Sequence, residues 1–115
     1  MPGIKLTSVP AYGTFHHLSG IVIDAPPSAF RVIVCIKVAG CWWVKPFRDA
    51  PLTPIRADGT FTAEVVTGGN DDKATELCAL LVPADYWPPD VAGSRTLPEA
   101  LVVSSVARAT VERTP

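Results

Sequence analysis

This chain contains few charged residues. Only 18% of its 115 residues are Asp, Glu, Lys or Arg, and the formal net charge is −1. The ten Lys and Arg residues are scattered singly along the chain. The sequence therefore lacks the basic field through which proteins bind phosphate backbones or anionic membrane surfaces, and we expect no nucleic-acid partner.

Long apolar runs are absent as well. No stretch approaches the roughly 18 consecutive apolar residues that a membrane-spanning helix requires, so we expect no membrane insertion. Residues 1–13 also lack the apolar centre that a secretory signal peptide needs.

Cysteine is scarce and odd in number, with Cys35, Cys41 and Cys78 only. Three cysteines cannot form a complete disulfide framework, and no Cys-x-x-Cys pair indicates a zinc site. We interpret Cys35 and Cys78 as small buried apolar residues, with a Cys35–Cys78 bridge between sheets as the alternative. His16 and His17 are adjacent in a predicted strand, so they point to opposite faces and cannot chelate one ion together. We predict no metal and no cofactor.

Catalytic motifs are also missing. The sequence contains no nucleophile elbow, phosphate-binding loop or metal-binding helix motif. The run from Gly68 to Asp72 lacks the spacing of an EF-hand calcium loop and indicates a polar turn instead. We therefore predict that the chain is not an enzyme.

The chain does contain many prolines and many apolar residues. Its twelve prolines must lie in connections, because proline is excluded from helix interiors and central strands. Hydrophobic residues make up 48% of the chain, which is typical of a globular domain. This composition predicts short strands joined by stiff loops.

Alternation at period two identifies the strands. In residues 30–39 one face, from Val32 to Val38, is wholly apolar, and the other, from Arg31 to Lys37, is mixed. We expect the first face on a core and the second partly solvated. Gly20, inside another predicted strand, marks a bulge or a close approach of another chain. The predicted strands are residues 4–9, 15–23, 30–39, 41–45, 60–65, 74–82 and 105–113, with a helical turn at 97–101.

These strands define the expected fold. About seven strands with turn signals every 8–12 residues are typical of an immunoglobulin-like sandwich. A helix is the competing interpretation of residues 74–82, because Ala, Glu and Leu favour helices. We predict an all-β protein, an Ig-like antiparallel β-sandwich, forming a single domain over residues 1–115.

Tryptophan supplies the candidate binding surface. Trp42 and Trp43 are adjacent in a strand and must point to opposite faces, so one of them should be outside the core. The outer ring either binds a ligand such as a sugar or is covered by a proline-rich loop. Tyr86 and Trp87 precede two prolines in a predicted loop, where they either plug the end of the sandwich or form a two-ring platform with the outward tryptophan. The predicted ligand-binding residues are Trp42, Trp43, Tyr86 and Trp87.

Six short segments carry a family resemblance: Trp42-Trp43-Val44-Lys45-Pro46, Pro51-Leu52-Thr53-Pro54-Ile55, Asp58-Gly59-Thr60, Thr67-Gly68-Gly69-Asn70-Asp71, Ala74-Thr75-Glu76 and Leu81-Val82-Pro83. Over about residues 9–111 the chain resembles a poorly characterised β-sandwich accessory module of secreted or cell-surface microbial proteins, some of which accompany glycoside hydrolases. The resemblance implies an extracellular, carbohydrate-associated setting and no established activity. The three cysteines and the lack of a signal peptide depart from that setting, which leaves an excised domain or an intracellular copy as alternatives.

Two functions follow from these patterns. The first is a non-catalytic module that binds polysaccharide through exposed tryptophans. The second is a structural domain that docks against another protein domain, in which the same aromatic residues are interface anchors or core.

Overall fold

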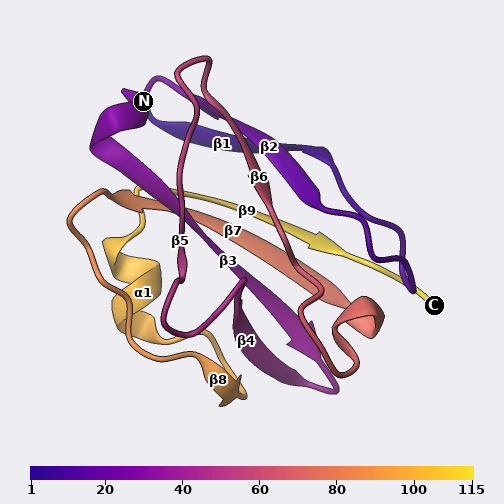
Figure 1. Cartoon of the computed structure of the whole chain (residues 1–115). Helices are drawn as coiled ribbons and strands as arrows, with labels where there is room; N and C mark the ends of the chain where they lie inside the picture. The colour runs from indigo at the N-terminus through magenta and orange to yellow at the C-terminus, as the bar shows by residue number, and fades with distance from the viewer.

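The computed structural model describes all 115 residues, which form two antiparallel sheets, one short α-helix and two 3₁₀ turns (Figure 1). The elements are β1 (Gly3–Ser8), β2 (Leu18–Ile23), η1 (Pro27–Ala29), β3 (Phe30–Val38), β4 (Cys41–Lys45), β5 (Leu52–Thr53), β6 (Thr60–Ala63), η2 (Asp71–Lys73), β7 (Glu76–Pro83), β8 (Ala92–Ser94), α1 (Glu99–Ser104) and β9 (Ala107–Glu112).

The two sheets differ in size. The smaller sheet has the strand order β1-β2-β6, and the larger has the order β8-β4-β3-β7-β9 with β5 also paired to β3. This arrangement confirms the predicted all-β sandwich. The structure has nine strands rather than about seven, because β5 and β8 span two and three residues and are too short to show alternation in sequence. The immunoglobulin-like part of the prediction remains a prediction.

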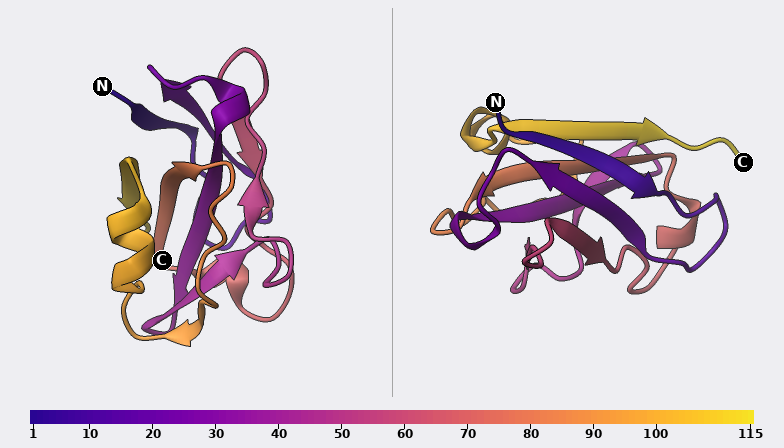
Figure 2. Two further views of the ribbon diagram at one scale, coloured as in Figure 1. Left: turned by 90° about the vertical axis from the view of Figure 1, so that its left-hand side faces the viewer. Right: turned by 90° about the horizontal axis from the view of Figure 1, so that it is seen from above.

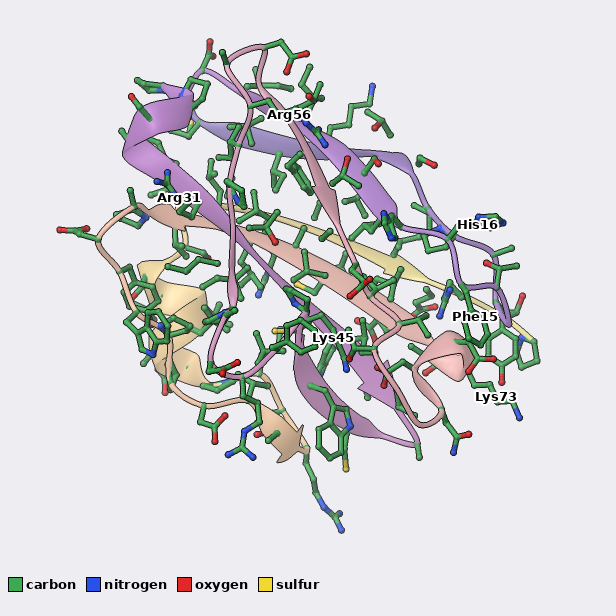
Figure 3. The ribbon with its side chains drawn as sticks, in the orientation of Figure 1. Phe15, His16, Arg31, Lys45, Arg56 and Lys73 are labelled. Atoms are coloured by element: carbon green, nitrogen blue, oxygen red, sulfur yellow. The ribbon has the colours of Figure 1, made fainter.

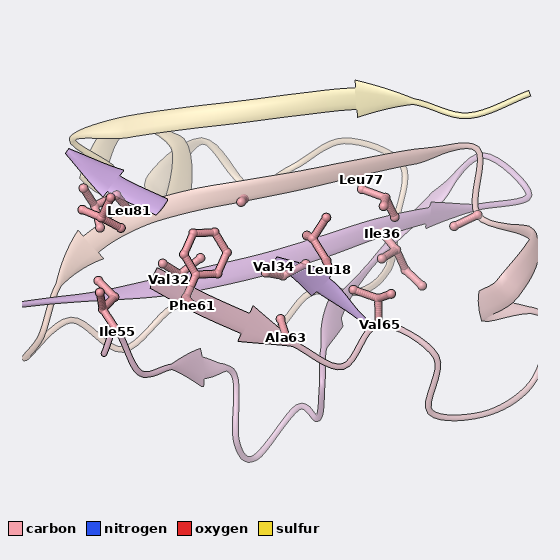
Figure 4. Packing of buried hydrophobic residues seen from close by; sticks show 13 residues of the cluster. Leu18, Val32, Val34, Ile36, Ile55, Phe61, Ala63, Val65, Leu77 and Leu81 are labelled. Atoms are coloured by element: carbon pink, nitrogen blue, oxygen red, sulfur yellow. The ribbon is translucent and has the colours of Figure 1, made fainter. Parts of the chain in front are cut away.

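The main core lies between the two sheets. Val32, Val34 and Ile36 of β3 face Phe61 and Ala63 of β6, and all five are buried (Figure 4). The alternation of apolar and polar residues through β6 therefore predicted its core face correctly. Burying a side chain of this size stabilises a fold by roughly 1.5–3 kcal/mol, so this cluster is the main source of stability.

The other face of the larger sheet is also covered at its centre, so only the ends of the predicted partly solvated face, Arg31 and Lys37, are partly exposed. Ile33 and Cys35 of β3 have no exposed surface. Leu101 of α1 and Val91 pack over them in a second buried cluster. Figure 2 shows α1 on one side of β3 and β6 on the other. The centre of β3, Val32–Ile36, is therefore buried on both faces, which a short mixed run of residues could not reveal.

The connection between β1 and β2 differs from the prediction. β2 begins at Leu18 rather than at Phe15, because β6 pairs with β2 only from Leu18 onwards and offers no partner before it. Phe15, His16 and His17 consequently lie exposed on the connection, and Figure 3 shows Phe15 and His16 at that end of the molecule. The prediction that the two histidines occupy a strand is wrong.

Cys35 and Cys78 lie opposite each other in the neighbouring strands β3 and β7. The alternative prediction of a Cys35–Cys78 disulfide between the sheets is therefore wrong, because both residues belong to one sheet and both thiols are free. Burial raises the pKa of each thiol, and the neighbouring Cys78 raises that of Cys35 further. The Thr110 hydroxyl donates to Cys78 Sγ at 3.6 Å. Both cysteines act as small core residues.

Candidate functional site

The most promising site is an open groove beside β4, which we call the Trp43 groove. Its volume is about 430 Å³. Its lining residues come from the β3–β4 hairpin and from the loop that follows β6: Val38, Ala39, Trp43, Lys45, Thr67, Gly68, Gly69, Asn70 and Asp71.

The position of Trp43 follows from strand geometry. Trp42 and Trp43 point to opposite faces of β4, as predicted; Trp42 is 6% exposed and Trp43 39% exposed. Trp43 pairs with Ile36 of β3, so it shares the face that carries the main core. The smaller sheet does not hydrogen-bond to β4 or β8 and ends at β6. Trp43 therefore lies beyond the edge of the smaller sheet, where only the loop after β6 stands over this face.

A bulge in β8 supports the Trp43 ring from the other side. Trp42 pairs with Ser94 and Trp43 with Ala92, so Gly93 is the extra residue between them. Gly93 has a φ of 76°, which glycine adopts without strain. A Cβ atom at this position would come 3.4 Å from Trp43 Cη2. Because glycine has no side chain, the indole packs directly on the backbone of β8.

A buried ion pair fixes the wall of the Trp43 groove. Lys45 Nζ donates to Asp71 Oδ2 at 2.5 Å and to Thr67 Oγ1 at 2.9 Å. The Thr67 backbone N–H donates to the same Asp71 oxygen at 3.1 Å. The Lys45 and Asp71 side chains are only 11% and 12% exposed. This network connects the loop formed by residues 67–71 to β4. Because the two charges are paired, the groove has no net charge.

The groove also presents free polar groups. Asn70 is exposed, and its side-chain amide makes no hydrogen bond within the chain. Gly69 has a φ of 56° and Gly68 carries no side chain, so the loop backbone is accessible from the groove. An aromatic ring with a few convergent polar groups is typical of small-ligand and sugar sites.

Trp87 lines a different depression. It is 62% exposed and lies beside Pro88, Pro89 and the Arg48–Asp90 ion pair, around a volume of about 390 Å³. Arg48 Nε donates to Asp90 Oδ1 at 2.9 Å, and Arg48 Nη2 donates to Asp90 Oδ2. The hydrogen bond from Arg48 lowers the pKa of Asp90. This pair holds the proline-rich loop over the β4–β5 connection.

Two exposed phenylalanines mark a third depression that the sequence prediction missed. Phe15 is 71% exposed and Phe47 is 51% exposed, and both line a volume of about 420 Å³ that also contacts Gly68 and Gly69. The glycine loop thus separates this depression from the Trp43 groove. Phe47 directly follows Pro46, and a large apolar residue in a proline-bounded connection was the available signal.

The structure separates the four predicted binding residues into two kinds. Trp42 and Tyr86 pack in or against the second buried cluster, where the Tyr86 hydroxyl donates to the Ala100 carbonyl at 3.4 Å. Lys37 Nζ covers Trp42 at 5.9 Å from its ring centroid. Trp43 and Trp87 are exposed, but they line separate depressions. The predicted platform of two rings in one depression is not formed.

No protein-family model, no curated protein and no solved structure matches this chain. The family resemblance and its extracellular setting therefore stay hypotheses. None of the helices is long and apolar enough to pass through a membrane. No three His, Cys, Asp or Glu side chains gather closely enough to hold a metal ion.

Proposed function

We propose that this chain is a non-catalytic binding module whose Trp43 groove holds a neutral polysaccharide chain. The observation that carries the proposal is the half-exposed indole of Trp43 in a groove whose two charges are paired with each other. Aromatic faces bind the apolar faces of sugar rings. The hydroxyl groups of the sugar can form hydrogen bonds with side-chain amides and backbone groups such as those at Asn70 and Gly69.

The charge balance of the groove supports a neutral ligand. Lys45 and Asp71 satisfy each other, so neither is left to attract an ion or to exchange a proton with a substrate. A ligand held by stacking and neutral hydrogen bonds should bind with little dependence on salt, because screening acts on unpaired charges. This balance also favours binding over catalysis.

Affinity electrophoresis against soluble glucans, xylans and mannans tests the proposal. We expect retardation by at least one polysaccharide and a loss of affinity of at least about tenfold in Trp43→Ala, since buried aromatic anchors dominate such interfaces. Trp87→Ala is the matched control, because it removes the other exposed tryptophan ring, which lines a different depression, and should leave binding unchanged.

Two outcomes contradict the proposal. No retardation by any polysaccharide, with unchanged tryptophan fluorescence, removes the carbohydrate function. Retardation that is lost in Trp87→Ala and kept in Trp43→Ala moves the site to the other depression. Thermal melts of both variants verify that each is folded.

Docking against another protein domain is the second candidate, and the exposure of Phe15 and Phe47 favours it. Two large apolar rings around one depression form the kind of patch that protein interfaces use. If this surface serves that function, hydrophobic-interaction chromatography should retain the native chain longer than Phe15→Ser/Phe47→Ser, and polysaccharide retardation should be absent. Equal retention of the two chains contradicts it.

A further inference from the structure

The strand β9 ends the larger sheet, and β1 of the smaller sheet packs against it without hydrogen-bonding to it. β9 pairs only with β7, in a regular register of six residues without proline. The other edges are short or distorted: β6 has four residues, β8 has three and contains a bulge, and β1 has an irregularity between Leu6 and Ser8. Proteins usually shorten or distort edge strands to prevent pairing with other chains, so a long regular edge is available for it.

The alternation of the ladder shows which groups of β9 face outward. The Arg113 N–H donates to the Thr75 carbonyl at 2.7 Å, just beyond the last register pair. Odd-numbered residues of β9 therefore bond to β7, and Arg108, Thr110 and Glu112 direct their N–H and C=O groups away from the sheet. The side chains of these three residues are also exposed. Both views in Figure 2 place β9 at the outer margin of the molecule.

We propose that β9 is a self-association surface, at which two copies of this chain pair antiparallel about a twofold axis at Thr110. In this register Arg108 lies opposite Glu112 of the second copy, and Glu112 lies opposite its Arg108. Thr110 lies opposite itself. All three pairs join residues whose backbone groups point outward, so the ladder bonds and the side-chain pairs form together.

Charge complementarity identifies the partner as a second copy. An antiparallel twofold pair needs a sequence that is complementary to its own reverse, and Arg-x-Thr-x-Glu meets that condition. Moving the axis by two residues in either direction places Arg108 opposite Arg108 or Glu112 opposite Glu112, which is repulsive. The exposed Val106, immediately before β9, adds apolar surface at the start of the edge.

Sedimentation equilibrium on the wild-type chain and three variants tests the proposal. We expect a monomer–dimer equilibrium in the range of about 1–500 μM, since a six-residue edge is a small interface. Arg108→Glu and Glu112→Arg each replace two attractive pairs by two repulsive ones, so each should raise the dissociation constant by at least about tenfold. The double variant Arg108→Glu/Glu112→Arg restores both pairs in reverse and should regain the wild-type constant.

Arg95→Glu is the matched control, because it reverses an exposed charge next to β8, at the opposite edge of the same sheet, and should not change association. A wild-type chain that stays monomeric throughout overturns the proposal. So does a dimer that neither single reversal weakens, or one that the double variant fails to restore. The measurement contains no carbohydrate, so its outcome is independent of the function proposed for the Trp43 groove.

Discussion

At the scale of single residues, the Lys45–Asp71 pair has the clearest energetic role. Both side chains are nearly buried, and Asp71 also accepts the Thr67 N–H. Lys45→Met should lower the free energy of unfolding by about 2–4 kcal/mol, because it leaves a desolvated carboxylate without its cation. Urea denaturation measures the loss.

The double variant Lys45→Met/Asp71→Asn is the control for that effect. The amide oxygen can still accept the Thr67 N–H, and no charge is left buried. We expect the double variant to be more stable than the sum of the two single losses predicts, with a coupling energy of about 1–3 kcal/mol. Strictly additive losses indicate that the two charges do not interact.

The buried thiols predict a dependence of stability on alkaline pH. Burial raises the pKa of Cys35 and Cys78 above the ordinary value of 9.0. The unfolded chain therefore releases protons above about pH 9 that the folded chain retains, so stability that is complete below pH 9 is lost as the pH rises. The expected slope is up to about 1.4 kcal/mol per pH unit for each thiol.

Urea denaturation between pH 8 and pH 10.5 checks this slope. Cys35→Ala/Cys78→Ala should be less stable at pH 8 but should lose stability less steeply than the wild-type chain above about pH 9. A double variant with the wild-type slope contradicts the assignment.

The sequence predicted the direction of a side chain correctly where the geometry of a single strand determines it. The opposite orientation of Trp42 and Trp43 follows from pleating alone. Which of the two faces outward depends on where the smaller sheet ends, and that is a relation between distant segments. The Lys45–Asp71 contact joins residues 26 positions apart, so nothing local could indicate it.

At the scale of elements, β2 depends on the absence of a side chain at Gly20. A Cβ atom there would lie 2.4 Å from Phe61 Cζ and 2.7 Å from the Lys5 carbonyl oxygen. Of the two alternatives for Gly20, the close approach is therefore found, but the approaching groups belong to this same chain: the Phe61 ring of β6 and the backbone of β1. An irregularity of β1 between Leu6 and Ser8 also lies opposite Gly20. Gly20→Ala should destabilise the fold by about 3 kcal/mol or more, measured by thermal melting.

Gly3→Ala is the matched control for this element. Gly3 lies in β1 of the same sheet, and a Cβ atom there would make an ordinary contact of 3.7 Å with Ile23. We expect a change of less than about 0.5 kcal/mol. If the two substitutions have equal effects, steric crowding at Gly20 is not the cause.

The predicted strand bounds were accurate where alternation, or a flanking turn and proline, marks the strand. They were wrong where neighbouring strands determine the bounds. The predicted bounds of β4 agree with the structure over Cys41–Lys45, and β3 differs by one residue. The segment before Leu18 has strand-like residues but no neighbour to bond with. β8 exists only because its backbone reaches β4, which its three-residue sequence cannot show.

At the scale of the whole molecule, Arg113 joins the end of the larger sheet to the β1–β2 connection of the smaller one. Its guanidinium donates to the carbonyls of Pro10 at 2.9 Å, Ala74 at 3.0 Å and Asp72 at 3.3 Å. Arg113→Ala should therefore lower the free energy of unfolding by about 2–4 kcal/mol, because several carbonyls lose their donors together.

Arg113→Lys separates geometry from charge. A single ammonium group cannot reach carbonyls that a planar guanidinium bridges, so we expect the lysine variant to recover less than half of the loss. Arg95→Ala, at an exposed position, should change stability by less than about 0.5 kcal/mol. Full recovery by lysine contradicts the multidentate role. Urea denaturation distinguishes the three variants.

The burial of β3 and β7 on both faces has a consequence for the chain before it folds. Val32–Ile36 and Leu77–Val82 are wholly apolar, free of proline and rich in β-branched or aliphatic residues. Such segments form intermolecular cross-β stacks when they are exposed. Arg31 and Lys37 flank the first run and Glu76 and Pro83 flank the second, in the positions of aggregation gatekeepers. We expect these four residues to oppose aggregation of the unfolded chain, in the interval before its own strands pair.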